Sequence, residues 1–314
     1  MRSSNSRPVI LVTEPAYFEN VMGRLRRIGH VIRGKPDRAY LLRTLPRVDA
    51  AVIRVETRLD GKILRRAARL KLIASATTGM NHVDTGEARR RGIRMVNLHG
   101  IHTIPTAEHT IALMLALLRR IAEVQELMRT GKWDRARWIG AQAHGKTMGI
   151  IGLGRIGSRA ARLGRALGLD VLAYDPYVPP ARFKSARRVT NLSALLRRSD
   201  IVSIHAALTD ETRGMIGAAR LRQFKPCAIL INTARGEIVD EIALLGALRA
   251  GRIAGAALDV FSQEPLPPGH PLRAYASRRG NLVLTPHLGA STREAVNAAA
   301  GEMAAAVGIF FGRA

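Results

Sequence analysis

The segment TMGIIGLGRIGSRAARLGRALGLDVLAYD, residues Thr147–Asp175, carries the strongest structural signal in this chain. An apolar run at 148–151 leads into the glycine-rich turn GLGRIG at 152–157, and an amphipathic stretch follows to about Leu167. A second apolar run at 170–174 ends at Asp175. The order strand, glycine turn, helix, strand and carboxylate is typical of a unit that binds a dinucleotide, and a purely structural glycine turn is the weaker alternative.

Each glycine of the turn has its own expected role. Gly152 permits the tight turn, and Gly154 has no side chain, so a pyrophosphate can approach the backbone. Gly157 lets the following helix pack closely on the strand. The unpaired amides at the start of that helix attract phosphate groups. The sequence therefore predicts a pyrophosphate site at this turn.

Asp175 indicates which dinucleotide binds. It lies 18 residues after Gly157, and no basic residue follows it until Arg182. Its carboxylate can accept hydrogen bonds from the adenosine ribose hydroxyls, and its charge would repel a 2′-phosphate. We therefore expect NAD as the cofactor in preference to NADP.

The composition is that of a globular protein. A length of 314 residues suggests about two domains of ~150 residues, and 47% hydrophobic with 24% charged residues is unlike a disordered chain. The one cysteine, Cys227, lies in the apolar run CAILIN, so we expect a small buried residue and a reducing compartment. Neither a signal peptide nor an apolar run of about 20 residues is present. A cytoplasmic protein without membrane contact is expected.

The net charge of +26 arises from 50 basic and 24 acidic residues. The basic residues are scattered without a block of five or six, and only 4% of residues are aromatic, with none interleaved among the basic clusters. This pattern favours a solvated arginine-rich surface over a specific nucleic-acid site. The field should nevertheless draw anions toward the protein.

The glycine turn lies in mid-chain, so the dinucleotide domain is expected to be inserted into another domain. We expect two Rossmann-like, doubly wound parallel-sheet α/β domains: a split substrate (catalytic) domain of residues 1–98 plus 291–314, and an NAD-binding domain of residues 99–290. One long helix from about Pro105 to Thr130 is predicted to bridge them, with Trp133 and Trp138 as packing anchors after it. A helix from Ser291 to Phe311 is expected to return to the first domain.

The expected strands and helices alternate along the chain, which favours parallel sheets. The strands are expected at 9–13, 50–54, 72–76, 94–97, 148–151, 170–174, 201–205, 228–232, 256–260 and 282–285. The further helices are expected at 18–28, 59–68, 82–91, 192–198 and 241–250.

Three polar residues follow predicted strands, where ligands of open parallel sheets bind. They are Arg235, Glu264 and His287. Arg235 could hold a carboxylate through two parallel hydrogen bonds, and His287 could donate a proton to a carbonyl oxygen. Glu264 could orient the imidazole and favour its protonated form. Taken singly, the alternatives are a surface ion-pair partner, a solvated loop carboxylate and a helix cap.

Five segments together resemble the signature segments of the D-isomer-specific 2-hydroxyacid dehydrogenase family. They are PTAEHT at 105–110, IIGLGRIG at 150–157, NTARGEIVD at 232–240, DVFSQEP at 259–265 and PHLGAST at 286–292. The resemblance runs from about Leu59 to Arg293, in the family's order and spacing. The chain is most similar to the phosphoglycerate dehydrogenase branch, without its C-terminal regulatory domain.

The resemblance implies a role for each matching position, and no metal site. Arg235 binds substrate and His287 is the acid–base paired with Glu264, which makes these three the catalytic set. The amides of Thr78 and Gly79 hold the substrate carboxylate, together with Arg235. The implied cofactor contacts are Gly152, Gly154, Arg155, Ile156, Gly157, Asp175, Thr209, Thr233, Ala234, Arg235, Asp259, His287, Gly289 and Thr78.

Departures from the family pattern concern the substrate. The loop that usually reads G-V-D-N-x-D has Met80, Asn81 and His82 instead, and His102 stands where many relatives have asparagine. His99 lies in a segment that also departs from the family pattern, and either His99 or His102 could touch the substrate. The expected partner is a small anionic 2-oxo or 2-hydroxy acid, with 3-phosphoglycerate, glyoxylate and hydroxypyruvate all open. The family's habit implies a homodimer. The alternative function is an NAD(H)-sensing, corepressor-like scaffold on the same fold.

Overall fold

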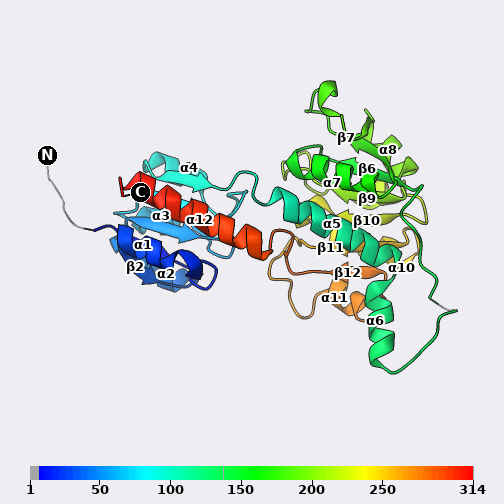
Figure 1. Ribbon diagram of the computed structural model, residues 1–314, viewed down its shortest axis with the longest axis horizontal. Coiled ribbons are helices and arrows are strands. Elements are labelled where there is room, and N and C mark those ends of the chain that lie inside the picture. The colour runs from blue at the N-terminus through cyan, green and yellow to red at the C-terminus, as the bar shows by residue number, and fades with distance from the viewer. Residues whose placement is uncertain (1–6, 137, 314) are drawn as a thin grey trace. The chain divides into compact units, whose positions relative to one another are not determined.

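The computed structural model describes residues 7–136 and 138–313, which fall into two compact units (Figure 1). Of these, residues 7–102 and 291–313 form unit 1, and residues 103–136 with 138–290 form unit 2. Each unit is an α/β fold built on one sheet. All the strand pairs of both sheets are parallel, so the expected fold class is confirmed.

The sheet of unit 1 has five strands in the order β2-β1-β3-β4-β5. This is the 2-1-3-4-5 order of a doubly wound fold, in which the chain changes direction beside the first strand. The strands are β1 (Val9–Val12), β2 (His30–Arg33), β3 (Ala50–Ile53), β4 (Leu72–Ser75) and β5 (Arg94–Asn97). The helices are α1 (Met22–Ile28), α2 (Arg38–Thr44), α3 (Gly61–Arg66), α4 (Thr85–Arg90) and α12 (Arg293–Phe310).

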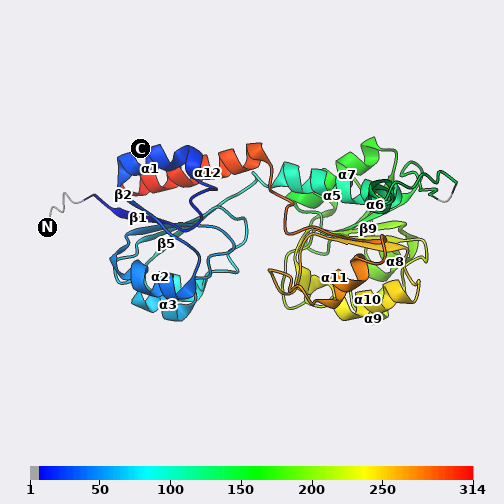
Figure 2. The same ribbon diagram turned by 90° about the horizontal axis from the view of Figure 1, so that it is seen from below.

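Helices cover both faces of this sheet (Figure 2). Because strand side chains alternate between faces, Ile10 and Val12 of β1 pack with α1 and α12, whereas Leu11 packs with α2 and α3. Strands β3 and β4 are buried along their whole length, which explains their continuous apolar sequence. The last helix, α12, contributes Met303 and Val307 to the same core as the first strand.

The sheet of unit 2 has seven strands in the order β12-β11-β10-β9-β6-β7-β8. Beginning from β6, this is the strand order of a dinucleotide-binding fold, in which the ligand binds beyond the C-terminal ends of β6 and β9, the neighbouring strands between which the strand order reverses. The strands are β6 (Thr147–Ile151), β7 (Asp170–Tyr174), β8 (Arg187–Arg188), β9 (Ile201–Ile204), β10 (Ile229–Asn232), β11 (Gly255–Leu258) and β12 (Leu282–Leu284). The helices are α5 (Thr103–Leu118), α6 (Ile121–Arg129), α7 (Arg155–Ala166), α8 (Leu192–Arg198), α9 (Ala218–Leu221), α10 (Glu241–Arg249) and α11 (Pro271–Ala276).

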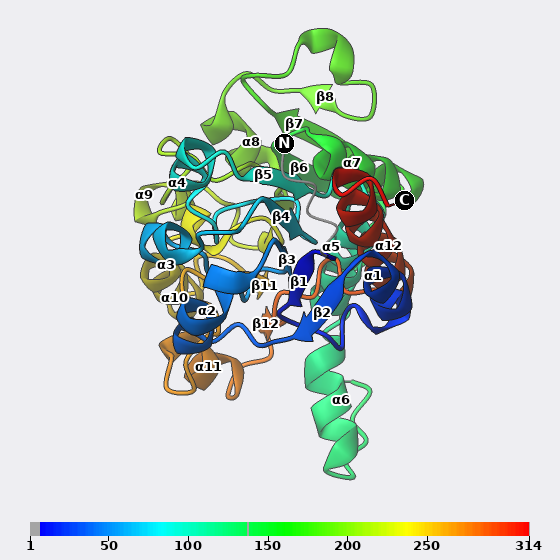
Figure 3. The ribbon, with the colours of Figure 1, turned by 90° about the vertical axis from the view of Figure 1, so that its left-hand side faces the viewer.

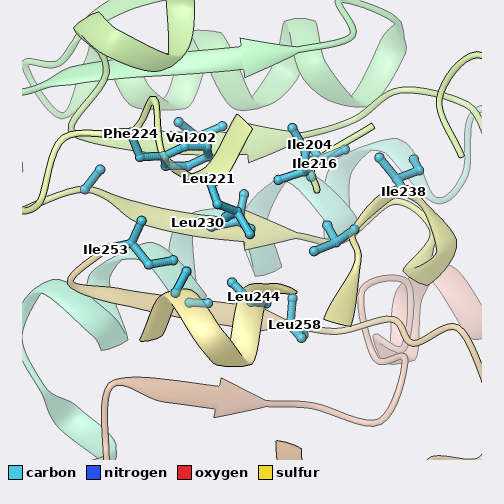
Figure 4. Close-up of a cluster of buried hydrophobic side chains, with 14 of the residues drawn as sticks. Val202, Ile204, Ile216, Leu221, Phe224, Leu230, Ile238, Leu244, Ile253 and Leu258 are labelled. Atoms are coloured by element: carbon cyan, nitrogen blue, oxygen red, sulfur yellow. The ribbon is translucent and has the colours of Figure 1, made fainter. Parts of the chain in front are cut away.

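Two separate cores hold this second sheet. Helices α5 and α7 pack on one face, where Met148 and Ile150 of β6 point. On the other face, Val202 and Ile204 of β9 join Leu230 and the side chains of α8 to α11 (Figure 4). Helix α6 has no buried residue and extends away from the body of its own unit (Figure 3).

Side-chain caps fix where several helices begin. Asp37, Asp60 and Asp84 each accept a hydrogen bond from the amide three residues later, at the starts of α2, α3 and α4. Thr292 does the same for α12, so this helix begins at Arg293 and not at Ser291 as expected. Such caps satisfy amides that have no partner within the helix.

The expected single helix over 105–130 is wrong, because two helices occupy this stretch. Helix α5 ends at Leu118, and Arg120 has a left-handed backbone with a φ of 55°. Helix α6 then begins at Ile121. A left-handed residue cannot continue a right-handed helix, so the chain changes direction at Arg120.

Two expectations about burial are also wrong. Cys227 is exposed, because it precedes β10 and does not belong to it. Trp133 is 77% exposed, so it does not anchor the loop after α6. Trp138 is half-buried, with the guanidinium of Arg120 4.4 Å from its ring centre. Within the described residues, no helix is long and apolar enough to cross a membrane.

Candidate active site

The glycine turn connects the end of β6 to the start of α7. Gly152 has a φ of 90°, and a Cβ there would lie 2.6 Å from the amide nitrogen of Ala206. A Cβ at Gly157 would lie 2.0 Å from the carbonyl oxygen of Gly152, so helix and strand approach this closely only with glycine. A Cβ at Gly154, by contrast, would meet nothing within 4 Å. Open space beside the first amides of a helix fits the pyrophosphate of a dinucleotide.

Asp175, at the end of β7, braces this turn. Its Oδ2 accepts a 2.8 Å hydrogen bond from the amide of Leu153, and its Oδ1 accepts bonds from the amides of Tyr177 and Val178. A carboxylate has about four acceptor positions, so it can still accept a ribose hydroxyl. Sequence reasoning expected the ribose contact and missed this structural role.

His205 lies directly behind the glycine turn, after β9. Its Nε2 is 2.9 Å from the hydroxyl of Ser203, and its amide donates to the carbonyl of Ile151. Burial lowers the pKa of His205 to about 4. The imidazole is therefore neutral at neutral pH and serves as packing beside the turn.

His287 and Glu264 form a hydrogen-bonded pair. His287 follows β12 with a left-handed φ of 55°, and its Nδ1 lies 2.7 Å from Oε2 of Glu264. The other carboxylate oxygen accepts a 3.0 Å bond from the amide of Phe261. The Nε2 of His287 makes no hydrogen bond within the part of the chain that is described, so it can meet a ligand.

The Glu264 carboxylate is held in its charged form. Burial alone would raise the pKa of Glu264, but the hydrogen bond and charge of His287, the amide of Phe261 and the charge of Arg235 together lower it. The side chain is therefore an anion at neutral pH. An anion at this place stabilises positive charge on the imidazole it contacts.

Asp259 fixes the turn that carries His287. Its carboxylate, 1% exposed, accepts hydrogen bonds from the hydroxyl of Thr285 at 2.6 Å and from the amides of Leu288 and Gly289 at 2.7 and 2.8 Å. The carbonyl of Asp259 accepts the amide of His287 at 2.8 Å. These bonds offset the cost of a left-handed backbone at a non-glycine residue.

His109, from α5, supports the same network. Its Nε2 lies 3.3 Å from Oδ1 of Asp259 and 3.2 Å from the hydroxyl of Thr285. Burial alone would raise the pKa of Asp259, but the hydrogen bonds from His109, Thr285 and Leu288 lower it. His109 was missed as a site residue, although it lies within the quoted segment PTAEHT, because only the fold brings α5 to the end of β11.

Arg235 follows β10, next to β11 in the same sheet. The side chain of Asn232 shapes this turn, because its Nδ2 donates to the carbonyl of Arg235 and its Oδ1 accepts the amide of Ala234. The hydroxyl of Thr233 is 2.9 Å from that of Thr110 on α5. The guanidinium of Arg235 donates to the carbonyl of Ala234 at 2.6 Å and retains further donors for a carboxylate.

The remaining cofactor candidates lie around the same crevice of unit 2. Arg155 and Ile156 are the first residues of α7, and Thr209 lies in the loop after β9, where its amide donates to Oγ1 of Thr212. Gly289 lies close to Asp259, since a Cβ there would be 3.1 Å from its Oδ2.

Thr78 and Gly79 belong to unit 1, in the loop after β4. The carbonyl of Gly79 accepts the hydroxyl of Thr77, and the carbonyl of Thr78 accepts Nδ2 of Asn97, both within 2.7 Å. The hydroxyl of Thr78 lies 3.1 Å from Nδ1 of His102. His82 reaches the hydroxyl of Ser75 at 3.0 Å. The two unusual histidines therefore buttress the loop expected to hold the substrate.

Arg54 and Glu14 are candidate residues that sequence reasoning missed. Arg54 follows β3, which is next to β4, and its guanidinium lies 3.9 Å from the ring centre of Tyr17. Glu14 follows β1, and burial raises its pKa despite its hydrogen bond from Thr57. The sequence signal was a charged residue within two positions of the end of a buried strand. No cluster of three or more potential metal ligands occurs among the described residues.

Comparison with protein families decides the affiliation of the chain. Residues 111–289 match the family described as D-isomer specific 2-hydroxyacid dehydrogenase, NAD binding domain. The chain belongs to this family. The expected family resemblance and the expected cofactor NAD are thereby confirmed.

Curated members of the D-isomer specific 2-hydroxyacid dehydrogenase family match most of the chain. The D-3-phosphoglycerate dehydrogenase of Archaeoglobus fulgidus is 41% identical over 289 residues, which are 91% of this chain and 54% of that protein. The glyoxylate reductase of Thermofilum pendens is 42% identical over 273 residues, covering 83% of this chain and 77% of that protein. The chain spans about half the length of the phosphoglycerate dehydrogenases that it matches.

Solved structures give the same picture over the whole fold. The TT0316 protein from Thermus thermophilus is 36% identical, with a TM-score of 0.83 and 94% of each chain covered. The D-lactate dehydrogenase from Aquifex aeolicus, complexed with NAD and lactic acid, is 27% identical with a TM-score of 0.86, covering 97% of this chain and 96% of that one.

Proposed function

We propose that this chain is an NAD-dependent oxidoreductase that interconverts a 2-oxo acid and a D-2-hydroxy acid. The observation that carries the proposal is the 2.7 Å pair of His287 and Glu264, which leaves Nε2 of the imidazole available for a ligand. Membership of the D-isomer specific 2-hydroxyacid dehydrogenase family supports the same reaction.

Bound NADH would supply the hydride, and the remaining work falls to residues of the chain. His287 donates a proton from Nε2 to the carbonyl oxygen of the 2-oxo acid, so that no free alkoxide has to form. Glu264 stabilises the protonated imidazole before this transfer and fixes its orientation through Nδ1. Arg235 holds the substrate carboxylate by parallel hydrogen bonds. In the oxidative direction His287 accepts the proton.

The decisive assay is oxidation of NADH by a panel of 2-oxo acids: glyoxylate, hydroxypyruvate, phosphohydroxypyruvate and pyruvate. The matched variant is His287→Asn, because asparagine tolerates a left-handed backbone and has no acid–base group. We expect the variant to bind NADH and to lose nearly all turnover. If the parent protein binds NADH but none of the 2-oxo acids in the panel causes NADH oxidation, the result would instead support the NAD(H)-sensing scaffold.

For the substrate, we propose 3-phosphoglycerate first and glyoxylate or hydroxypyruvate second. Arg54 supports a substrate with a second negative charge, because it follows β3 beside the strand that leads to Thr78 and Gly79. Arg54→Gln should raise KM for the phosphorylated acid about tenfold or more and leave KM for glyoxylate little changed. An equal change for both acids would count against the phosphorylated substrate.

We further propose that unit 1 is the substrate domain and that the protein is a homodimer. Light scattering on the purified protein tests the second point, since a dimer has twice the 34.2 kDa of one chain. A mass of one chain at micromolar concentration would refute it.

A further inference from the structure

An arginine-lined groove occupies the edge of unit 2 that lies opposite the catalytic residues. The strands β11 and β12 run parallel, and Asp259, Glu264 and His287 follow their C-terminal ends. The groove lies at their N-terminal ends, where Gly280 and Asn281 lead into β12. Because parallel strands begin at one edge and end at the other, this groove is not part of the dinucleotide crevice.

Two adjoining hollows form the groove, with volumes of about 600 and 290 Å³. They share Arg249, Tyr275, Arg278 and Arg279 as lining residues. The larger hollow falls within the range of about 300–1,000 Å³ that is typical of small-molecule sites. The groove therefore has the size of a ligand site, unlike a single surface charge.

The charge of the groove is strongly positive. Four arginines line the larger hollow: Arg120, Arg249, Arg278 and Arg279. Among its described lining residues Glu123 is the one acid, and it is paired with Arg120. No other carboxylate in the described chain forms an ion pair with the remaining three. These guanidinium groups are thus left with donors that a phosphate group accepts in pairs.

The groove is held in shape by contacts within unit 2. A Cβ at Gly280 would lie 1.6 Å from Cγ of Glu123, so the start of α6 passes directly over this glycine. The hydroxyl of Tyr275 donates to Asn281 at 3.2 Å, and Nδ2 of Asn281 donates to the carbonyl of Ala254. A preformed groove loses less entropy on binding than a set of free surface side chains.

The alternative explanation is that these arginines only stabilise the C-terminal ends of helices and bind no ligand. Arg249 ends α10, and Arg278 and Arg279 follow α11, where a cation is favoured. Arg197 and Arg198 end α8 in the same way but line neither hollow. What separates the groove from that second pair is its enclosure by α6, α10 and α11 and its two aromatic lining residues, Trp138 and Tyr275.

We propose that this groove binds a polyphosphate anion, either free or carried by a nucleoside, at a site distinct from the NAD site. The arginines bind the phosphoryl groups, and the ring of Tyr275, which lines both hollows, offers a face on which a base can stack. The groove is a bounded hollow and not a long channel, which favours a small ligand over nucleic acid.

The test is isothermal titration calorimetry on the whole chain at about 0.15 M salt, with saturating NADH so that the dinucleotide crevice is filled. The probes are inorganic tripolyphosphate and ATP, each against the parent protein. We expect saturable binding of one molecule per chain. Equal affinities would identify free polyphosphate as the source, and tighter binding of ATP than of tripolyphosphate would identify a nucleotide.

The matched variants are the double substitutions Arg278→Gln with Arg279→Gln, and Arg197→Gln with Arg198→Gln, which remove the same charge. The first should weaken binding about tenfold or more for each guanidinium that contacts phosphate, and the second less than about twofold. Equal weakening by both pairs, or no saturable binding by the parent, would overturn the proposal. The proposal would also be overturned if single-stranded oligonucleotides bound with higher affinity than tripolyphosphate and if their affinity rose with length.

Discussion

The imidazole of His287 and the carboxylate of Glu264 are joined by a 2.7 Å contact between Nδ1 and Oε2, and the histidine side of this contact rests on a left-handed backbone. The carboxylate is partly buried and needs a donor, and the backbone conformation needs the hydrogen bonds that Asp259 provides. The pair therefore depends on the segments that follow β11 and β12, two strands that are paired in one sheet.

Replacing Glu264 by Gln should lower kcat for 2-oxo acid reduction by about ten- to a hundredfold. The amide keeps the shape and one acceptor but removes the negative charge that stabilises the imidazolium. NADH affinity, measured by fluorescence titration, should change little. An unchanged kcat in Glu264→Gln would show that the charge of this carboxylate does not assist His287.

Two glycines of the turn allow the effect of a substitution on NADH binding to be measured separately from its effect on stability. Gly154→Ala should fold normally, since its Cβ meets nothing within 4 Å, and should bind NADH at least tenfold more weakly because the methyl group occupies the approach of the pyrophosphate. Gly157→Ala should instead destabilise the protein by about 1–3 kcal/mol or more, because its Cβ would overlap the carbonyl of Gly152.

Gly246→Ala is the matched control for both glycine variants. It lies in α10 with nothing within 4 Å, so alanine should stabilise by about 0.5–1 kcal/mol and leave NADH binding unchanged. Thermal unfolding and NADH titration measure the three variants side by side. Unaltered NADH affinity in Gly154→Ala would place the pyrophosphate elsewhere.

Asp175→Asn should reduce the preference for NAD over NADP by about ten- to several-hundredfold, measured as the ratio of kcat/KM values. The amide oxygen can still accept the amide of Leu153, but Nδ2 would then face the amides of Tyr177 and Val178, so thermal unfolding of the variant is measured beside its kinetics. Asp170→Asn, on the same strand but exposed, removes the same charge and should leave the ratio unchanged. A preference unaffected by Asp175→Asn would assign the discrimination to other residues.

Thr285→Val should cost about 1–3 kcal/mol of unfolding free energy and lower kcat, because it removes the 2.6 Å hydroxyl bond to Asp259 and leaves a buried carboxylate short of a donor. Thr285→Ser keeps the hydroxyl and should behave nearly like the parent. Denaturant unfolding and steady-state kinetics test this together. If valine and serine were indistinguishable, the hydroxyl would have no part in holding the turn of His287.

Acidification should destabilise the protein through His205. Because burial lowers its pKa to about 4, the unfolded chain takes up a proton there as pH falls from about 6.5 to 4, while the folded protein does not. The unfolding free energy therefore decreases over this window as pH is lowered. In His205→Gln the slope of the unfolding free energy against pH should be smaller, by the equivalent of at most one bound proton. Parallel pH dependences for parent and variant would contradict the assignment.

The local pattern of residues 147–175 was sufficient to predict β6, α7 and β7, because strand and helix periodicity and three glycines all agree there. The ends of β10, β11 and β12 could likewise be predicted from apolar runs. The break at Arg120 could not, since apolar periodicity continues across it and only its left-handed backbone ends α5. Strand β2 was missed because it lies at a sheet edge with two exposed residues and lacks a long apolar run.

Individual candidate residues could be proposed from the sequence where they follow a strand, as Arg235, Glu264 and His287 do. Their supports were not, because these come from distant parts of the chain. His109 lies 150 residues before Asp259, and no spacing rule connects a helix residue to a strand end. Asp175 shows the same limit, since its bonds to backbone amides are visible only in the folded turn.

Helix α12 gives unit 1 an unusual order of assembly during synthesis. Its Met303 and Val307 complete the core around Ile10 and Val12, and Arg313 donates to the carbonyl of Ile28 across 285 residues. A ribosome therefore releases the five strands of unit 1 long before the helix that covers one face of their sheet. The described elements of unit 2 are contiguous in sequence, so unit 2 can fold completely before α12 has been synthesised and packed on the sheet of unit 1. Nascent chains stopped before residue 293 should accordingly depend on chaperones that shield exposed apolar strands.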